Sequence, residues 1–266
     1  MIEVNYHGRL GNNIFQYFIG RIISDKLNFD LICPNDYEFM PSIRKGNSFS
    51  NNPESHGFHG HHIGIENIIK NNSPRKIIVD GFFQRTEYFN KEYVKRILNI
   101  DRYLFRKPEN NSISLNIRSG DLYKVWKQGN EDVHPHQNPC PYSYYSNILN
   151  QYPEKKKYII CERIDDPVLL KLKDNYDIGV VSQSPIEDFY FIYHSEIIVL
   201  SVSTIAWWSA WLSEATKIYY PVLGYFDQKI RSDINLIVNE SRYEYIQLNT
   251  LDWKSTNEQI KQILWT

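Results

Sequence analysis

Residues 196–221 read EIIVLSVSTIAWWSAWLSEATKIYYP, and this stretch decides the fold. The apolar run at 197–200 has the length and composition of a buried parallel strand. Ser203 and Thr204 then supply hydroxyl groups and a helix cap, and a helix is expected from about residue 205. The free N–H groups and the dipole of such a helix favour phosphate at its N-terminus. The stretch therefore predicts a parallel α/β sheet that handles a phosphorylated ligand.

Outside this stretch, apolar segments alternate between strand and helix patterns. Strands are expected at 2–6, 31–33, 76–82, 112–117, 157–161, 178–181, 197–200 and 217–220, and helices at 13–26, 89–98, 142–151 and 257–264. This alternation predicts an α/β protein with parallel sheets in two Rossmann-like domains, which bind ligands at the carboxyl ends of strands. We place the domains at residues 1–108 and 109–266, and leave open that the terminal helix packs back on the first domain. Residues 39–64 and 122–141 are expected to be loops.

Composition and charge exclude several classes of protein. The 266 residues carry a net charge of −1, which argues against broad binding to nucleic acid or to anionic membranes. The sequence shows neither a run of about 18 apolar residues nor a basic, apolar leader, so we expect no transmembrane span and no signal peptide. The three cysteines are widely spaced and odd in number, which suits a protein of a reducing compartment. We expect a cytoplasmic protein or an excised domain, of bacterial or viral origin. The sequence leaves its oligomeric state undecided.

Two short segments follow expected strands and could contact a ligand. Gly8 and Gly11 flank Arg9, and glycines there either allow close approach of a ligand or form a tight turn. Their spacing is neither G-x-G-x-x-G nor that of a P-loop. Arg118 opens the loop after the first strand of the second domain, where its planar fork could clamp phosphate. Asp121 could then accept a proton, or it could form a structural ion pair with the arginine.

The other polar side chains give weaker signals. Asp188 is either a solvated carboxylate at a helix start, stabilised by the dipole, or a carboxylate that reads a guanine ring. His134 and His136 lie in a proline-bounded loop, where one could face an acceptor sugar. The sequence has no D-x-D motif. We expect no metal site, since the earlier histidines lack a nearby cysteine and tetrahedral spacing; they are His56, His59, His61 and His62.

Four segments together resemble glycosyltransferase family 11, the α-1,2-fucosyltransferases. They read GRLGNNIFQY at 8–17, DGFFQRTEYF at 80–89, NIRSGD at 116–121 and STIAWWSAWL at 203–212. The resemblance implies a GT-B fold, with two Rossmann-like domains facing a central cleft. It also implies inverting, metal-independent transfer of fucose from GDP-fucose to a glycan hydroxyl, of the galactoside α-1,2 type. The implied partners are a GDP-sugar donor and an oligosaccharide acceptor, with no cofactor.

The resemblance also assigns roles to residues. Arg118 would grip the donor diphosphate, and Asp188 would read guanine. The hydroxyl turn formed by Ser203 and Thr204 would contact phosphate. The glycine turn would lie across the cleft and touch the donor phosphates or the acceptor, through Gly8, Arg9, Gly11 and Asn12.

The chain departs from the family pattern around the arginine. Asn116 replaces a histidine, so no histidine transfers a proton there, although we keep Asn116 as a donor-binding residue. Ser119 replaces a second arginine and removes one positive charge. These departures leave open a transferase for another nucleotide sugar, or a catalytically inactive protein that binds GDP or a glycan. The candidates for the acceptor side and the general base are Asp121, Glu162, His134 and His136.

Overall fold

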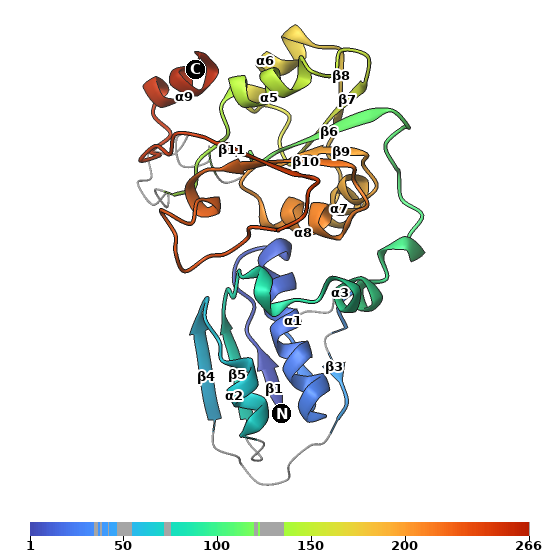
Figure 1. The fold of residues 1–266 in the computed structure, drawn as a ribbon, viewed down its shortest axis with the longest axis vertical. Helices are drawn as coiled ribbons and strands as arrows, with labels where there is room; N and C mark the ends of the chain where they lie inside the picture. Colours follow the sequence, from blue (N-terminus) through green and yellow to red (C-terminus); the bar gives the residue numbers. More distant parts are fainter. Residues whose placement is uncertain are drawn as a thin grey trace. The chain divides into compact units, whose positions relative to one another are not determined.

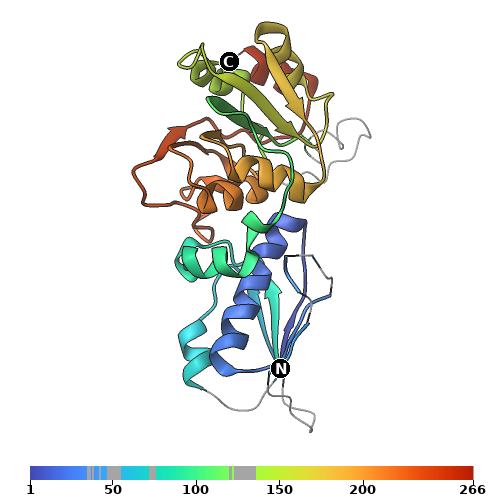
Figure 2. The same ribbon diagram turned by 90° about the vertical axis from the view of Figure 1, so that its right-hand side faces the viewer.

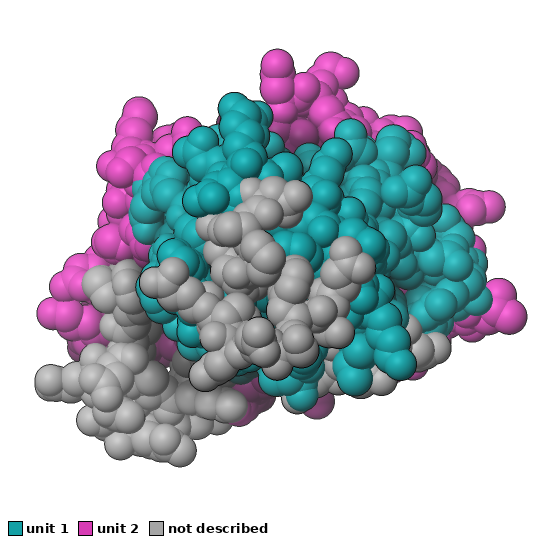
Figure 3. All heavy atoms as spheres, turned by 90° about the horizontal axis from the view of Figure 1, so that it is seen from below, with its two compact units in different colours: residues 1–103, 233–237 teal, residues 104–232, 238–266 magenta. Residues whose placement is uncertain are grey.

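The computed structural model describes residues 1–34, 37, 39–41, 43–46, 55–71, 76–119, 122 and 136–265. The chain forms two compact units, which are teal and magenta in Figure 3. Unit 1 comprises Met1–Tyr103 and Asp233–Ile237, and unit 2 comprises Leu104–Ser232 and Val238–Thr266. In the described ranges, no helix combines the length and the apolar character that a membrane crossing requires.

Unit 1 is built on a five-stranded sheet with the order β3-β2-β1-β5-β4 (Figure 1). Its described strand pairs are all parallel except that of β2 with β3. The strands are β1 (Ile2–Val4), β2 (Leu31–Ile32), β3 (Ile43–Arg44), β4 (Ser55–Gly60) and β5 (Lys76–Gly81). The helices are α1 (Leu10–Leu27), α2 (Ile65–Lys70) and α3 (Lys91–Leu98).

Helix α1 is the main helix that packs on this sheet. It begins at Leu10, earlier than its apolar period indicates, because Gly8 turns the chain sharply with a φ of 74°. Phe18 and Ile19 on its apolar face are fully buried. The helix ends at Leu27, and its C-cap residue Asn28 has a φ of 52°, in the left-handed region that asparagine tolerates. The first strand, the glycine turn and α1 thus form the strand–helix unit that the sequence predicts.

Unit 2 is a six-stranded sheet with the order β11-β10-β9-β6-β7-β8, and its described strand pairs are all parallel. The strands are β6 (Ser112–Ile117), β7 (Lys156–Cys161), β8 (Ile178–Val181), β9 (Ile197–Val199), β10 (Lys217–Val222) and β11 (Tyr243–Gln247). In chain order this is the arrangement of the dinucleotide-binding fold. The expected α/β class, with a Rossmann-like second domain, is confirmed.

Helices cover both faces of this second sheet (Figures 1 and 2). On one face, α9 (Asn257–Trp265) contacts α5 (Tyr142–Leu149) and α6 (Pro167–Asn175). On the other, α7 (Pro185–Tyr193) packs against α8 (Thr204–Leu212). The terminal helix belongs to unit 2, although the sequence left open that it returns to the first domain.

The tryptophans of α8 form part of the core of unit 2. Trp207 and Trp208 are fully buried, and Trp211 is 5% exposed. The rings of Trp207 and Trp211 stack with centroids 5.5 Å apart. These three side chains therefore pack behind the start of the helix and do not form a sugar-stacking surface.

Three edge strands are not visible in the sequence pattern. Strands β3 and β4 lie within residues 39–64, where we expected a loop, and β11 lies in a stretch for which we expected no strand. β4 reads SHGFHG, lies at the edge of the sheet and is mostly exposed. A strand that buries so little of its surface needs no apolar alternation, so periodicity does not reveal it.

The carboxyl ends of β4 and β5 approach each other closely at two glycines. A Cβ atom on Gly81 would lie 2.5 Å from the carbonyl oxygen of Gly60 and 2.8 Å from the carbonyl carbon of His59. These are backbone atoms, so the strands would have to separate to admit a side chain. Glycine at position 81 therefore fixes the spacing of the two strand ends.

We expect Gly81→Ala to destabilise the protein by about 1–3 kcal/mol, because the added methyl group overpacks against backbone. Equilibrium urea unfolding followed by far-UV circular dichroism measures this as a lower midpoint. Gly64→Ala is the matched control, since the nearest atom to a Cβ there is 3.4 Å away. Equal midpoints for the two variants would show that this close approach does not constrain the strands.

Candidate functional site

The candidate site of unit 2 lies where β6 and β9 lie side by side. The chain runs outward from β6 through β7 to β8 on one side, and from β9 through β10 to β11 on the other. Ligands of open α/β sheets bind outside the carboxyl ends of the strands at this reversal of strand order. Arg118 directly follows β6, and the turn that opens α8 follows β9. Two of the predicted phosphate-binding features therefore meet at one edge of the sheet.

Arg118 is bound directly to the turn that opens α8. Its Nη1 atom donates a hydrogen bond of 3.1 Å to the carbonyl oxygen of Val202. Val202 is buried and directly precedes Ser203, the N-cap residue of α8. The bond holds a permanent positive charge beside the positive end of a helix dipole, an arrangement that an anionic ligand stabilises.

The N-terminus of α8 is not closed by its own cap residue. Ser203 has an extended backbone, but its hydroxyl makes no capping hydrogen bond. The neighbouring helices differ: Asp166 caps α6 through two backbone N–H groups, and Ser184 forms a capping box with Glu187 on α7. The Ser203 hydroxyl is therefore not used to cap α8.

Asn116 ties the two central strands together below this turn. Its Oδ1 atom accepts a hydrogen bond of 2.5 Å from the hydroxyl of Ser201, and its carbonyl oxygen accepts one of 3.0 Å from Tyr145. The residue is 8% exposed. Ser119 is also buried, and its hydroxyl accepts a hydrogen bond from the backbone N–H of Arg163. Both departures from the family pattern are thus used in contacts within the protein.

Asp188 lies in the first turn of α7, beyond the carboxyl end of β8. Its Oδ1 atom accepts a hydrogen bond of 3.3 Å from the backbone N–H of Gln183. Burial raises the pKa of this carboxyl to about 7, and the neighbouring charge of Glu187 acts in the same direction. The group therefore changes its charge near neutral pH.

The remaining sequence candidates lie in different parts of the chain. Glu162 is exposed and follows β7, and His136 packs edge-on against Tyr225. Asp121 and His134 lie outside the described residues. The glycine-turn residues belong to unit 1, where Arg9 is the N-cap residue of α1 and Asn12 accepts a hydrogen bond from Gln84; they are Gly8, Arg9, Gly11 and Asn12.

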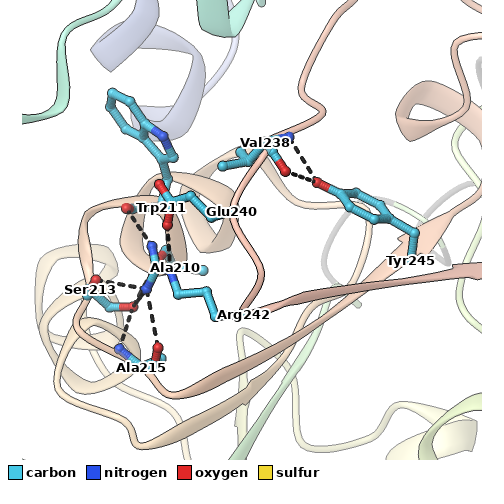
Figure 4. Close-up of polar contacts among 8 residues, drawn as sticks. All are labelled: Ala210, Trp211, Ser213, Ala215, Val238, Glu240, Arg242 and Tyr245. Carbon is cyan, nitrogen blue, oxygen red and sulfur yellow. Dashed lines mark hydrogen bonds and ion pairs between the residues drawn. The ribbon is translucent and has the colours of Figure 1, made fainter.

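Arg242, which the sequence does not single out, holds the opposite end of α8 (Figure 4). Its guanidinium donates to the carbonyl oxygens of Ala210, Trp211, Ser213 and Ala215, at 3.0 Å for Trp211 and 2.8 Å for Ser213. Glu240 balances its charge, with an Nε–Oε2 distance of 2.5 Å. A cation that satisfies the last carbonyl groups complements the helix dipole and fixes the helix along its axis.

The segment that precedes Arg242 is held in place by Tyr245 of β11. The hydroxyl of Tyr245 donates to the carbonyl oxygen of Val238 at 2.6 Å and accepts from its N–H group at 2.8 Å (Figure 4).

Among the described residues, no group of three or more histidine, cysteine or acidic side chains is placed to hold a metal ion.

Comparison with known proteins supports the fold. No family model matches the chain, and no curated protein matches it. The fold is similar to that of FUT1 from Arabidopsis thaliana, solved as a mutant in complex with GDP, with a TM-score of 0.51. The similarity covers 82% of this chain and 70% of that chain at 12% sequence identity. It confirms the expected GT-B-like α/β class.

We expect Arg242→Met to lower the free energy of unfolding by about 2–4 kcal/mol, because it leaves several carbonyl groups and the Glu240 carboxylate without their cation. Arg242→Lys should recover part of this, since an ammonium group cannot reach carbonyls spread over a helix end. Denaturant unfolding followed by tryptophan fluorescence measures this, and α8 carries three of the six tryptophans of the chain.

Lys254→Met is the control, since its ion pair with Asp252 is mostly exposed and contributes less than about 1 kcal/mol. If Arg242→Met unfolded at the same denaturant concentration as Lys254→Met, the guanidinium would not be what holds the helix end.

Proposed function

We propose that this chain is a glycosyltransferase that uses a GDP-sugar donor. The donor we propose is GDP-fucose, the acceptor a glycan hydroxyl, and the transfer an inverting one that forms an α-1,2 linkage, as in glycosyltransferase family 11. The observation that carries the proposal is the bond from Arg118 to the turn that opens α8. The likeness of the fold to a protein solved with GDP supports it.

The chemistry of the step explains why these groups are suited to it. The bond from the anomeric carbon to the β-phosphate breaks through an oxocarbenium-like transition state, by analogy with glycoside hydrolysis. Negative charge then develops on the leaving GDP. In the proposal, Arg118 and the N–H groups of α8 stabilise that charge, as preorganised donors do in other enzymes. They supply what a divalent cation supplies elsewhere, so we propose that transfer needs no metal or cofactor.

The other donor contacts belong to the same proposal. The hydroxyls of Ser203 and Thr204 would bind phosphate, and the Asp188 carboxylate would accept from the guanine ring. Asn116 would act by holding β6 and β9 together beneath the phosphate. Contacts from the glycine turn, and an acceptor-side role for Glu162, His134 or His136 or a proton-accepting role for Asp121, stay predictions.

A nucleotide panel tests the proposal. We expect GDP to raise the melting temperature of the protein in a thermal-shift assay, and UDP and CDP to leave it unchanged. Incubation with GDP-fucose and candidate acceptors should then release GDP. Binding of GDP with no release on any acceptor would favour the alternative of an inactive GDP- or glycan-binding protein, in keeping with the inward-facing Asn116 and Ser119.

We expect Arg118→Ala to lower turnover of GDP-fucose by at least about 100-fold, because it removes a charge that stabilises the leaving group. Arg118→Lys should fall between, since it keeps the charge but loses the planar fork. GDP release measured at saturating donor gives the comparison.

Arg163→Ala is the matched control. This arginine also follows a strand of the sheet, but its guanidinium is bound to Asp165 at the surface. Turnover that is unchanged in Arg118→Ala would refute the role of Arg118.

We expect GDP affinity to fall as the pH drops below about 7. Burial favours the neutral form of Asp188, and the protonated carboxyl loses an acceptor that the N–H groups of guanine need. Affinity should therefore rise with pH through 7 and level off above 8. Calorimetric titrations between pH 6 and 8.5 measure the slope.

Asp188→Asn should bind GDP about tenfold more weakly, and its affinity for GDP should not change with pH. Asp174→Asn, at an exposed position of α6, is the control and should keep the pH dependence of GDP affinity. If the GDP affinity of Asp188→Asn changed with pH as that of the wild type does, another group would be responsible for the pH dependence.

A further inference from the structure

The residues that follow β6 and β9 are held by contacts other than the sheet ladder. The ladder between these two strands ends where Leu115 pairs with Val199. Arg118 and Val202 both lie beyond this point, one on each chain segment. Groups that stabilise a developing charge contribute most when their spacing is already correct before the ligand binds. In this region, side chains must therefore set that spacing.

Val202 uses both of its backbone polar groups to contact other segments of unit 2. Its carbonyl oxygen accepts the hydrogen bond of 3.1 Å from Nη1 of Arg118. Its N–H group donates a hydrogen bond to the sulfur atom of Cys140. Val202 and Cys140 are each 3% exposed, so the bond between them is shielded from competing water. The position of the turn that opens α8 therefore depends on a thiol as well as on the arginine.

Cys140 is bound in turn to Tyr145 of α5. The hydroxyl of Tyr145 is hydrogen-bonded to the thiol, and it donates to the carbonyl oxygen of Asn116 at 3.0 Å. Because a hydroxyl has one proton to donate, the S–H group of Cys140 is the donor of the bond to Tyr145. Burial raises the pKa of the thiol to about 12, so the S–H group is present at neutral pH. The two side chains thus connect Val202 to Asn116.

These contacts close a ring of hydrogen bonds around the turn. The ring runs from Arg118 through Val202, Cys140 and Tyr145 to Asn116, from which the backbone leads back to Arg118. Its members other than Arg118 are at most 8% exposed. In a buried network whose polar groups are satisfied, a displacement leaves a buried donor or acceptor unpaired, and this is costly. The network therefore favours one spacing of Arg118 and the turn.

The local sequence fixes Cys140 and Tyr145 in place. Cys140 stands between Pro139 and Pro141, whose rings restrict the backbone on both sides. Pro141 is the N-cap residue of α5, the helix that carries Tyr145. Tyr145 is 1% exposed, and its ring packs edge-on against that of Tyr144 with centroids 4.9 Å apart. Neither the thiol nor the hydroxyl can shift without repacking the core of unit 2.

We infer, on the basis of the transferase proposed above, that Cys140 and Tyr145 are positioning residues for the donor diphosphate. They act through Val202 and Asn116, and hold Arg118 and the α8 turn at the spacing that the diphosphate requires. All members of the ring belong to unit 2. Loss of the thiol or the hydroxyl lets the turn shift, and a misplacement of about 1 Å can cost on the order of 100-fold in rate.

Calorimetric titration with GDP tests the inference, on variants of the full chain whose folding is checked by circular dichroism. We expect Tyr145→Phe and Cys140→Ala each to weaken GDP binding by about tenfold, the equivalent of one hydrogen bond. Cys140→Ser should bind GDP more tightly than Cys140→Ala, since a hydroxyl can also donate and accept. A merely structural role would lower the melting temperature of these variants and leave their GDP affinity unchanged.

Cys33→Ala and Tyr152→Phe are the matched controls. Cys33 is a buried thiol of unit 1 that is hydrogen-bonded to the side chain of Tyr6. The hydroxyl of Tyr152 is bonded to that of Tyr219 at 2.9 Å in unit 2. Neither residue belongs to the ring around the α8 turn, so both variants should bind GDP as the wild type does.

A double-mutant cycle shows whether Tyr145 acts through Arg118. Tyr145→Phe should weaken GDP binding about tenfold in the wild type and less than about threefold in the Arg118→Ala background, since coupled residues are not additive. Cys140→Ala takes its place in the cycle if Tyr145→Phe does not fold. Equal factors in the two backgrounds, or wild-type GDP affinity in the ring variants, overturn the inference. Wild-type protein that does not bind GDP instead overturns the proposed function, and the inference with it.

Discussion

The pairing of β6 with β9 is the interaction on which the phosphate site of unit 2 depends. These strands are far apart in the sequence, and each leads into one component of the site. The Ser201–Asn116 hydrogen bond extends their pairing beyond the last ladder bond, at the level where the chain leaves the sheet. Arg118 and the α8 turn are therefore positioned by the same contact, and neither could shift along its strand without breaking it.

The two ends of helix α8 differ in how their polar groups are used. Its C-terminal carbonyl groups are occupied by Arg242, its tryptophans are buried, and its N-terminal cap residue leaves its hydroxyl unused by the helix. A helix that is fixed along its axis presents its first N–H groups at a constant position. Because such donors need no reorganisation when charge develops, their contribution is larger than that of mobile groups.

Much of this could be predicted from the sequence, for identifiable reasons. Strand β9 and helix α8 are revealed by a continuous apolar run followed by hydroxyl residues, since both are buried. Strand β4 escapes detection because an exposed edge strand needs no apolar alternation. Arg242 lies far along the chain from α8, and no local pattern marks a residue that acts on a distant helix end.

The return of the chain at Asp233–Ile237 affects the order in which the protein can fold. The backbone N–H of Thr86 is bonded to Asn235 at 2.7 Å, its hydroxyl contacts Ile237, and Arg85 donates to the carbonyl oxygen of Asp233. Residues 84–86 lack these partners until the ribosome has made most of unit 2. Unit 1 is thus the first to be synthesised but cannot be completed first, although domains generally fold as they emerge. A fragment ending at Tyr103 would leave these groups to water.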